Sequence, residues 1–193
     1  MVRIFIALPV PMDVATQFAA LVPADLAGLK RVDPELLHIT LAFVGWTEEE
    51  RIGVMAAAVA AAARPVRSFR VTVSGAGRFP PAGRPRVVWV ATASEAAAEI
   101  ERLGGLVRAE LKRQRVRFDP KPLRSHVTLA RVRDDATVDE TRAIAAAMAA
   151  TRVPEGLAFA ADAVHVMESV LSPRGPRYSS RARVPLLDAD PPG

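Results

Sequence analysis

Hydrophobic positions along the chain switch between a period of two and a period near 3.6, which predicts strands and helices in alternation. Strand-like stretches, apolar or alternating, cover residues 2–10, 36–45, 67–79, 84–93, 126–132, 157–172 and 176–187. Helical spacing covers residues 12–30, 47–64, 94–115 and 137–153. The sequence therefore predicts an α/β protein.

Capping residues and prolines along the chain indicate where the helices begin and end. Thr47 with Glu50, and Thr137 with Glu140, have the spacing of a capping box, in which each residue satisfies a backbone N–H at the helix start. Pro23 interrupts the helix of residues 12–30 or opens a second short one. We therefore expect helices beginning at Thr47 and Thr137.

The two halves of the chain carry nearly the same heptapeptide. HITLAFV begins at His38 and HVTLARV at His126, and the two agree at five of seven positions. Each copy follows a helical region and precedes a helix with capping-box spacing. We interpret this as an internal duplication with pseudo-twofold symmetry in a single domain of residues 1–187, followed by a flexible tail, DADPPG, at 188–193.

The repeated motif places an imidazole beside a hydroxyl. Successive side chains of a strand point to opposite faces, so His38 shares a face with Thr40, and His126 with Thr128. Two such faces across a cleft would bracket one small anionic group. Imidazoles titrate near pH 6.5, so one can take a proton from a nucleophile while the other gives a proton to a leaving oxygen.

Two other interpretations of the histidines stay open at this point. A histidine in an apolar strand is commonly a buried, hydrogen-bonded core residue, although that role requires no matched threonine and no second copy. A zinc site is the other rival, but the motifs lack HxxxH spacing, and the nearest acidic residues, Glu35 and Asp119, follow no shared pattern.

Composition narrows the classes of function. The 26 Lys and Arg against 21 Asp and Glu give a net charge of +5, which favours anionic partners, although biased genome composition also produces arginine-rich chains. The absence of cysteine excludes disulfides, thiolate metal sites and a cysteine nucleophile. The N-terminus lacks a signal-peptide core, and the longest apolar run, 54–63, is too short to span a membrane, so we expect a soluble, cytoplasmic protein.

With these motifs the sequence resembles the two-histidine phosphoesterase superfamily, and within it the RNA 2′,3′-cyclic phosphodiesterases, also called 2′-5′ RNA ligases. The similar stretches are RIFIALPVP, LLHITLAFVG, GRFPPAGRPRVVWV, SHVTLAR and VMESVLSPRGPRYSSRARVPL. The resemblance implies a bilobal fold of two antiparallel sheets with helices outside and an active cleft between the lobes. It also implies hydrolysis of 2′,3′-cyclic phosphates to 2′-phosphates without metal, ATP or other cofactor, and weaker reversible 2′-5′ ligation.

Residue by residue, the resemblance implies that His38 and His126 are catalytic and that Thr40 and Thr128 bind phosphate. It further implies that Arg131 contacts the substrate and that Phe43 stacks on a base. Strict alternation of side chains along a strand disagrees with the last two roles. It places Phe43 and Arg131 on the face opposite the histidines unless the strand ends or twists. We assign His126 as the base and His38 as the acid, although the symmetry of the motifs leaves the order open.

The remaining candidates are weaker. His165 lies in a strand without a threonine partner, so we expect a structural or surface role. Arg78, Arg84 and Arg86 surround a Pro/Gly loop that could hold an RNA backbone or be solvated. We expect a monomer that acts on RNA ends or small cyclic nucleotides. The alternatives are a non-catalytic nucleotide- or RNA-binding module and a metal-dependent phosphodiesterase.

Overall fold

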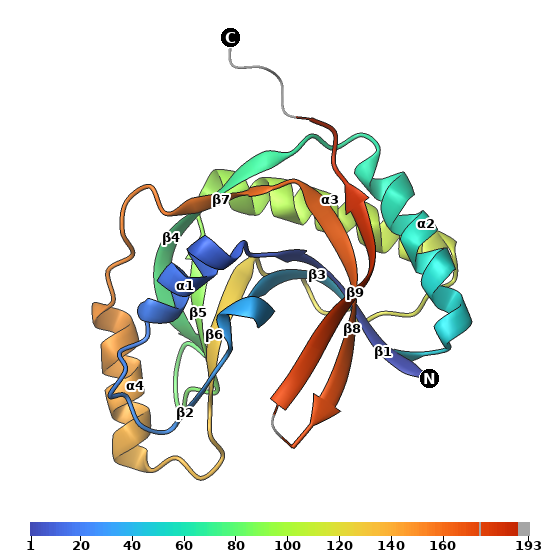
Figure 1. The fold of residues 1–193 in the computed structure, drawn as a ribbon. Coiled ribbons are helices and arrows are strands. Elements are labelled where there is room, and N and C mark those ends of the chain that lie inside the picture. Colours follow the sequence, from blue (N-terminus) through green and yellow to red (C-terminus); the bar gives the residue numbers. More distant parts are fainter. Residues whose placement is uncertain (174, 189–193) are drawn as a thin grey trace.

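The computed structural model of the chain describes residues 1–173 and 175–188 (Figure 1). Strands are β1 (Val2–Pro9), β2 (Leu29–Arg31), β3 (His38–Thr47), β4 (Phe69–Phe79), β5 (Val87–Thr92), β6 (His126–Val132), β7 (Ala158–Ala161), β8 (Ala163–Ser172) and β9 (Gly175–Pro185). Helices are α1 (Met12–Ala20), α2 (Ile52–Ala63), α3 (Ser94–Arg113) and α4 (Val138–Ala150), with short 3-10 turns at Pro34–Leu36 and Glu49–Arg51.

The strands form two antiparallel halves that meet at a narrow seam. The strand order is β7-β4-β5-β6-β3-β1-β8-β9, and β2 also pairs with β6. At the seam β3 pairs with β6 through Ile39 and Val127, the central residues of the two His-x-Thr motifs. The predicted α/β class with two antiparallel halves is confirmed, and the seam makes the halves one curled sheet.

Helices α2 and α3 pack against each other on the outer side of this sheet, and α4 lies against the β4 half (Figure 1). The buried residues of α3 recur at helical spacing, with Ile100, Leu103, Val107 and Leu111 fully enclosed. They belong to one continuous core together with the inward-facing residues of the strands. The sheet therefore turns its outer face to the helices and leaves its inner face to a cleft.

One of the two predicted helix starts is wrong. Thr47 is the last residue of β3, paired with Val2 of β1, and α2 begins only at Ile52 without a side-chain cap. Strand pairing thus overrides the capping-box spacing of Thr47 and Glu50. In contrast, Thr137 and Glu140 form the predicted capping box at α4, with both reciprocal hydrogen bonds present.

Other elements are shorter than predicted. Helix α1 ends at Ala20, and part of the predicted helix instead forms β2, which adds to the edge of β6. The predicted strand 157–172 divides around Asp162 into β7, which pairs with β4, and β8, which pairs with β1. Local hydrophobic spacing cannot report such a change of partner strand.

The end of the described chain is anchored at Asp188, whose backbone oxygen accepts a hydrogen bond from Arg67 Nη1 at 2.9 Å. The rest of the predicted tail, 189–193, lies outside the described residues. Over residues 1–173 and 175–188, no helix is long and apolar enough to cross a membrane.

Candidate active site

The two motifs line one cleft of about 670 Å³ on the inner face of the sheet. All six site residues of the sequence analysis contribute to its walls: His38, Thr40, Phe43, His126, Thr128 and Arg131. The far wall comes from the β8–β9 hairpin, through Leu171, Pro176 and Tyr178. Residues far apart in the sequence are thereby collected around one space.

The register at the seam explains why the motifs come together. Because β3 and β6 are antiparallel and Ile39 lies opposite Val127, His38 neighbours Thr128 and Thr40 neighbours His126. Ile39 and Val127 are themselves fully buried on the helix side. The sheet therefore presents two imidazoles and two hydroxyls as a compact, nearly twofold set.

Each imidazole is held by the same backbone contact. His38 Nδ1 lies 2.7 Å from the carbonyl oxygen of Leu36, and His126 Nδ1 lies 2.7 Å from that of Arg124. A carbonyl oxygen only accepts, so Nδ1 donates in both rings. This contact fixes the tautomer and leaves Nε2 as the nitrogen that can exchange a proton with a substrate.

Burial shifts both histidines toward the neutral form. Desolvation is the largest cause of the lowered pKa of His38, and repulsion from His126 and Arg131 lowers that pKa further. Desolvation is also the largest cause of the lowered pKa of His126, followed by repulsion from Arg124 and Arg131. In both residues the carbonyl hydrogen bond opposes the shift. An anionic phosphate in the cleft would stabilise the charged imidazole and reverse part of it.

Aromatic rings enclose each imidazole. The His38 ring lies 4.8 Å from Phe5 and 5.5 Å from Tyr178, measured between centroids. The His126 ring lies 5.2 Å from Phe79 and 6.3 Å from Trp89. These rings displace water and fix the orientation of both imidazoles.

Phe43 and Arg131 lie on the cleft side, so strict alternation was wrong for them. In β3 the pairing with β1 skips Leu41, because Ile6 lies opposite Ala42 while Ala7 lies opposite Thr40. Each motif contains an extra residue of this kind, called a β-bulge, which shifts the phase of the side chains.

The bulge of β6 occurs at the same place in its motif. Val88 lies opposite Ala130 and Trp89 opposite Thr128, so Leu129 is skipped. In both strands the leucine and the following alanine are buried together, and the next residue emerges in the cleft. The repeated heptapeptide therefore has a β-bulge at the same position in both strands.

The cleft is positively charged, partly through residues that the sequence analysis missed. Arg3, Lys30, Arg31 and Arg131 line it with one carboxylate, Asp33. The Arg3 guanidinium lies 4.8 Å from the centre of the Phe43 ring.

Only some of the missed cleft residues could have been predicted from a pattern in the sequence. Arg3 and Phe5 share one face of the alternating first strand, and that pattern could have indicated them. Tyr178 of β9 had no comparable signal, because its position depends on the pairing of β9 with β8 and of β8 with β1.

The other candidates lie outside the cleft lining. His165 Nδ1 lies 2.9 Å from Ser180 Oγ of the neighbouring strand β9. Arg78 Nη1 donates to the backbone oxygens of Pro80 and Gly83 and so holds its own loop together. Among the described residues, no group of three or more His, Asp or Glu side chains is arranged to hold a metal ion.

Two imidazoles and two hydroxyls facing a positively charged cleft form a site suited to acid-base chemistry on a phosphate ester. The family model of the 2′-5′ RNA ligase superfamily matches residues 11–172. The chain belongs to this family, which is the two-histidine phosphoesterase family that the sequence resembles.

Individual relatives agree with this placement. The chain is 34% identical over 190 residues to an RNA 2′,3′-cyclic phosphodiesterase of Thermus thermophilus, covering 92% of this chain and 86% of the relative. It is 32% identical over 133 residues to one of Archaeoglobus fulgidus, covering 68% and 73%. The crystal structure of TT0787 of T. thermophilus superposes with a TM-score of 0.76 at 29% identity, over 95% of this chain and 97% of that one. Apo LigT of E. coli shares the fold, with a TM-score of 0.74 at 21% identity, over 96% and 98%.

Proposed function

We propose that this protein hydrolyses the 2′,3′-cyclic phosphate ends of RNA to 2′-phosphates by two-histidine acid-base catalysis, without a metal or ATP. The observation that carries the proposal is the antiparallel register of the two motifs, which sets His38 beside Thr128 and Thr40 beside His126. The names of the relatives, RNA 2′,3′-cyclic phosphodiesterases, support the choice of substrate.

In the proposed reaction a water molecule attacks the cyclic phosphorus and the bond from phosphorus to the ribose O3′ breaks. Neutral His126 accepts the water proton at Nε2, and protonated His38 donates its Nε2 proton to the departing O3′. The product carries a 2′-phosphate and a 3′-hydroxyl. Proton exchange with solvent then returns the two imidazoles to their starting forms.

The threonines and Arg131 stabilise the charge that develops on the nonbridging oxygens. Within the described residues neither the Thr40 nor the Thr128 hydroxyl has a hydrogen-bond partner, although both line the cleft, so both can donate to phosphate. Arg131 lines the same cleft as both imidazoles, so its guanidinium can also reach the group that they flank. Donors fixed before the substrate binds need no reorganisation during the reaction.

We infer that the same site also binds the terminal base and supports weak 2′-5′ ligation. Phe43, under the Arg3 guanidinium, offers an aromatic surface on which the terminal base can stack. Attack by the 5′-hydroxyl of a second RNA in place of water would form a 2′-5′ linkage through the same proton transfers. One related fold, E. coli LigT, has been crystallised with 3′-AMP.

We further propose that the protein acts as a monomer in the cytoplasm. Both motifs and every wall of the cleft come from one chain, so the proposed chemistry requires no second copy. Size-exclusion chromatography with light scattering tests this directly. A dimer would contradict the proposal.

The deciding experiment incubates the purified protein, in EDTA, with an oligoribonucleotide that ends in a 2′,3′-cyclic phosphate and identifies the product terminus. A 2′-phosphate is expected. A 3′-phosphate would contradict the assignment of the leaving oxygen, and an unchanged substrate would favour a non-catalytic binding module. Activity that returns only with added Zn²⁺ or Mn²⁺ would favour a metal-dependent enzyme instead.

A further inference from the structure

A second hollow of about 850 Å³ adjoins the cleft, and Lys30 and Arg131 line both. It lies across the ends of β2, β6 and β5, and we call it the Arg86 groove. Its charged lining contains five cations and two carboxylates: Lys30, Arg84, Arg86, Arg131, Arg133, Asp134 and Asp135. The groove therefore continues the positive charge of the cleft beyond the catalytic set.

Two of the five cations form hydrogen bonds or ion pairs within the protein. Arg84 Nη2 donates to the backbone oxygens of Arg133, Asp134 and Ala136 and holds the turn after β6. Arg133 forms a two-point ion pair with Asp135, at 2.9 and 2.7 Å. The guanidinium groups of Arg84 and Arg133 are therefore already bound to other groups of the protein and are not available to a ligand.

The other three cations remain available to a ligand. Among the described residues, the side chains of Lys30, Arg86 and Arg131 have no hydrogen-bond or ion-pair partner. Arg84 and Arg86 belong to the same loop, but of these two only Arg86 has a side chain that is free to bind a ligand.

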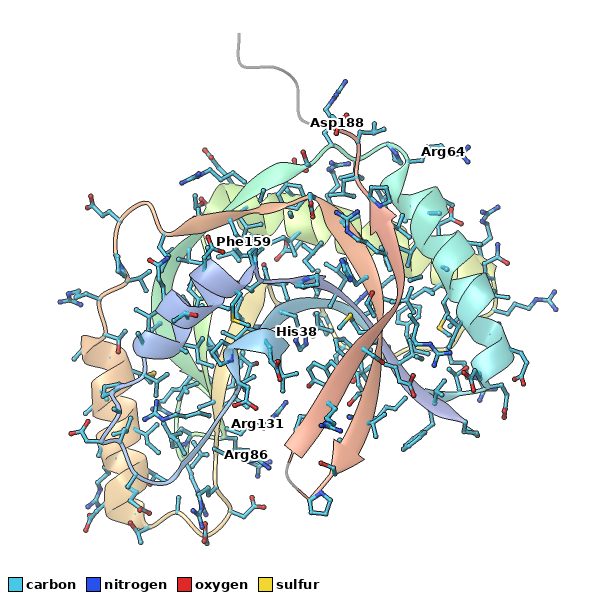
Figure 2. The ribbon with its side chains drawn as sticks, in the orientation of Figure 1. His38, Arg64, Arg86, Arg131, Phe159 and Asp188 are labelled. Atoms are coloured by element: carbon cyan, nitrogen blue, oxygen red, sulfur yellow. The ribbon has the colours of Figure 1, made fainter. Side chains whose placement is uncertain are left out.

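Strand pairing sets Lys30 beside Arg131, and Arg86, just before β5, lines the same hollow. Arg131 of β6 lies opposite Lys30 of β2 on one edge and opposite Val87 of β5 on the other. Arg86 immediately precedes Val87, and its backbone oxygen accepts the N–H of Val132 at 2.9 Å. Figure 2 shows the resulting direction, with His38, Arg131 and Arg86 following one another away from the catalytic set.

We propose that the Arg86 groove binds the RNA backbone on the 5′ side of the terminal nucleotide, with Arg86 and Lys30 holding the first internucleotide phosphates. This inference rests on the proposed function, because it assumes an RNA end in the cleft. Cations in a row suit a polyanionic strand and contact it without reading its sequence. The protein therefore prefers an RNA end to a free cyclic mononucleotide.

The first test compares substrates of different length. The quantity measured is the ratio of kcat/KM for a pentanucleotide ending in 2′,3′-cyclic phosphate to kcat/KM for 2′,3′-cyclic AMP. Arg86→Ala is expected to lower this ratio about three- to fivefold, and Arg86→Glu about tenfold or more, because a partly exposed charge contact contributes modestly and its reversal repels phosphate. An unchanged ratio in Arg86→Glu would overturn the proposal.

The matched control is Arg64→Glu, which changes net charge equally at the end of α2, far from both hollows (Figure 2). Arg64→Glu is expected to keep the wild-type ratio of the two kcat/KM values. If Arg64→Glu lowers the ratio as much as Arg86→Glu, the effect is one of overall charge and the groove assignment fails.

A second test does not depend on turnover, so it separates this inference from the proposed function. Binding of a fluorescent pentanucleotide ending in a 2′-phosphate is measured by anisotropy across salt concentrations. Loss of one phosphate contact in Arg86→Ala is expected to reduce the slope of log K against log salt by about 0.7, with no change in Arg64→Ala. Equal slopes for wild type and Arg86→Ala would overturn the groove even in a protein that hydrolyses RNA ends.

Discussion

The strand of the first motif, β3, and the strand of the second, β6, are alike in backbone and unlike in surroundings. Each fixes its imidazole through the carbonyl two residues earlier, and each bulges at the leucine after the threonine. However, His38 lies deeper than His126, against Phe5 and Tyr178, whereas His126 lies near the Arg124 guanidinium.

Separate acid and base roles can arise because only part of the surroundings of the two imidazoles is repeated. The repeated heptapeptide encodes the features that depend on local backbone, so it makes the two sites equivalent in geometry. The neighbours of each imidazole come from segments that are not repeated, such as β1, β9 and the chain before β6. A duplicated motif can therefore supply two chemically different histidines.

The largest expected effect comes from removing either imidazole. His38→Ala and His126→Ala are each expected to lower kcat/KM for a cyclic-phosphate RNA end by about 10²–10⁴-fold, the usual contribution of general acid-base catalysis. The double variant should fall little further, because the two groups act as a unit. Steady-state kinetics measures this, and His165→Ala, outside the cleft, should retain wild-type activity. Wild-type turnover by the double variant would contradict the mechanism.

A change of leaving group distinguishes the two imidazoles. In a substrate whose bridging 3′ oxygen is replaced by sulfur, the thiolate departs without a proton, so the general acid becomes dispensable. His38→Ala should recover most of its lost activity, about 10²-fold or more, while His126→Ala should remain impaired. Single-turnover rates on the oxygen and sulfur substrates provide the comparison. Recovery of His126→Ala instead would exchange the acid and base assignments.

The threonines should show a smaller and more symmetric effect. Thr40→Val and Thr128→Val keep the side-chain shape and remove a hydroxyl donor to phosphate, which costs about 10- to 100-fold in kcat for a hydrogen bond to a charged group. Thr→Ser at either position should restore most of it. Circular dichroism and thermal unfolding check that the variants are folded. A Thr→Val variant with full kcat would exclude that hydroxyl from the charge stabilisation.

The sequence alone indicated which histidines and threonines meet in the cleft, because their placement follows from two simple rules. Alternation puts His and Thr on one face, and the repetition of His38-Thr40 as His126-Thr128 is difficult to explain by packing. The same alternation misplaced Phe43 and Arg131, because a bulge at Leu41 or Leu129 depends on how partner strands align. Thr47 and Glu50 misled for a related reason, since the pairing of β3 with β1 extends the strand through Thr47. Local patterns predict local structure until a tertiary contact competes with it.

The smallest expected effect is a shift in the titration of each histidine, and it tests the difference between the two sites directly. Arg124 repels the charged form of His126 only, whereas Arg131 repels that of both His38 and His126. Arg124→Gln should therefore raise the pKa of His126 and not that of His38, whose only link to Arg124 is the charge on His126, while Arg131→Gln should raise both.

Because burial and repulsion hold both pKa values below 6.5, the state with one charged imidazole becomes populated only as the pH falls. The alkaline limb of kcat/KM against pH, which reports loss of the proton from the general acid His38, should thus lie on the acidic side of 6.5 in the wild type and move to higher pH in Arg131→Gln. NMR titration of the imidazole Hε1 protons measures the individual pKa values in each variant. Equal shifts of His38 and His126 in Arg124→Gln would mean that the two sites share one electrostatic environment, and the division of labour would then have to come from the bound substrate.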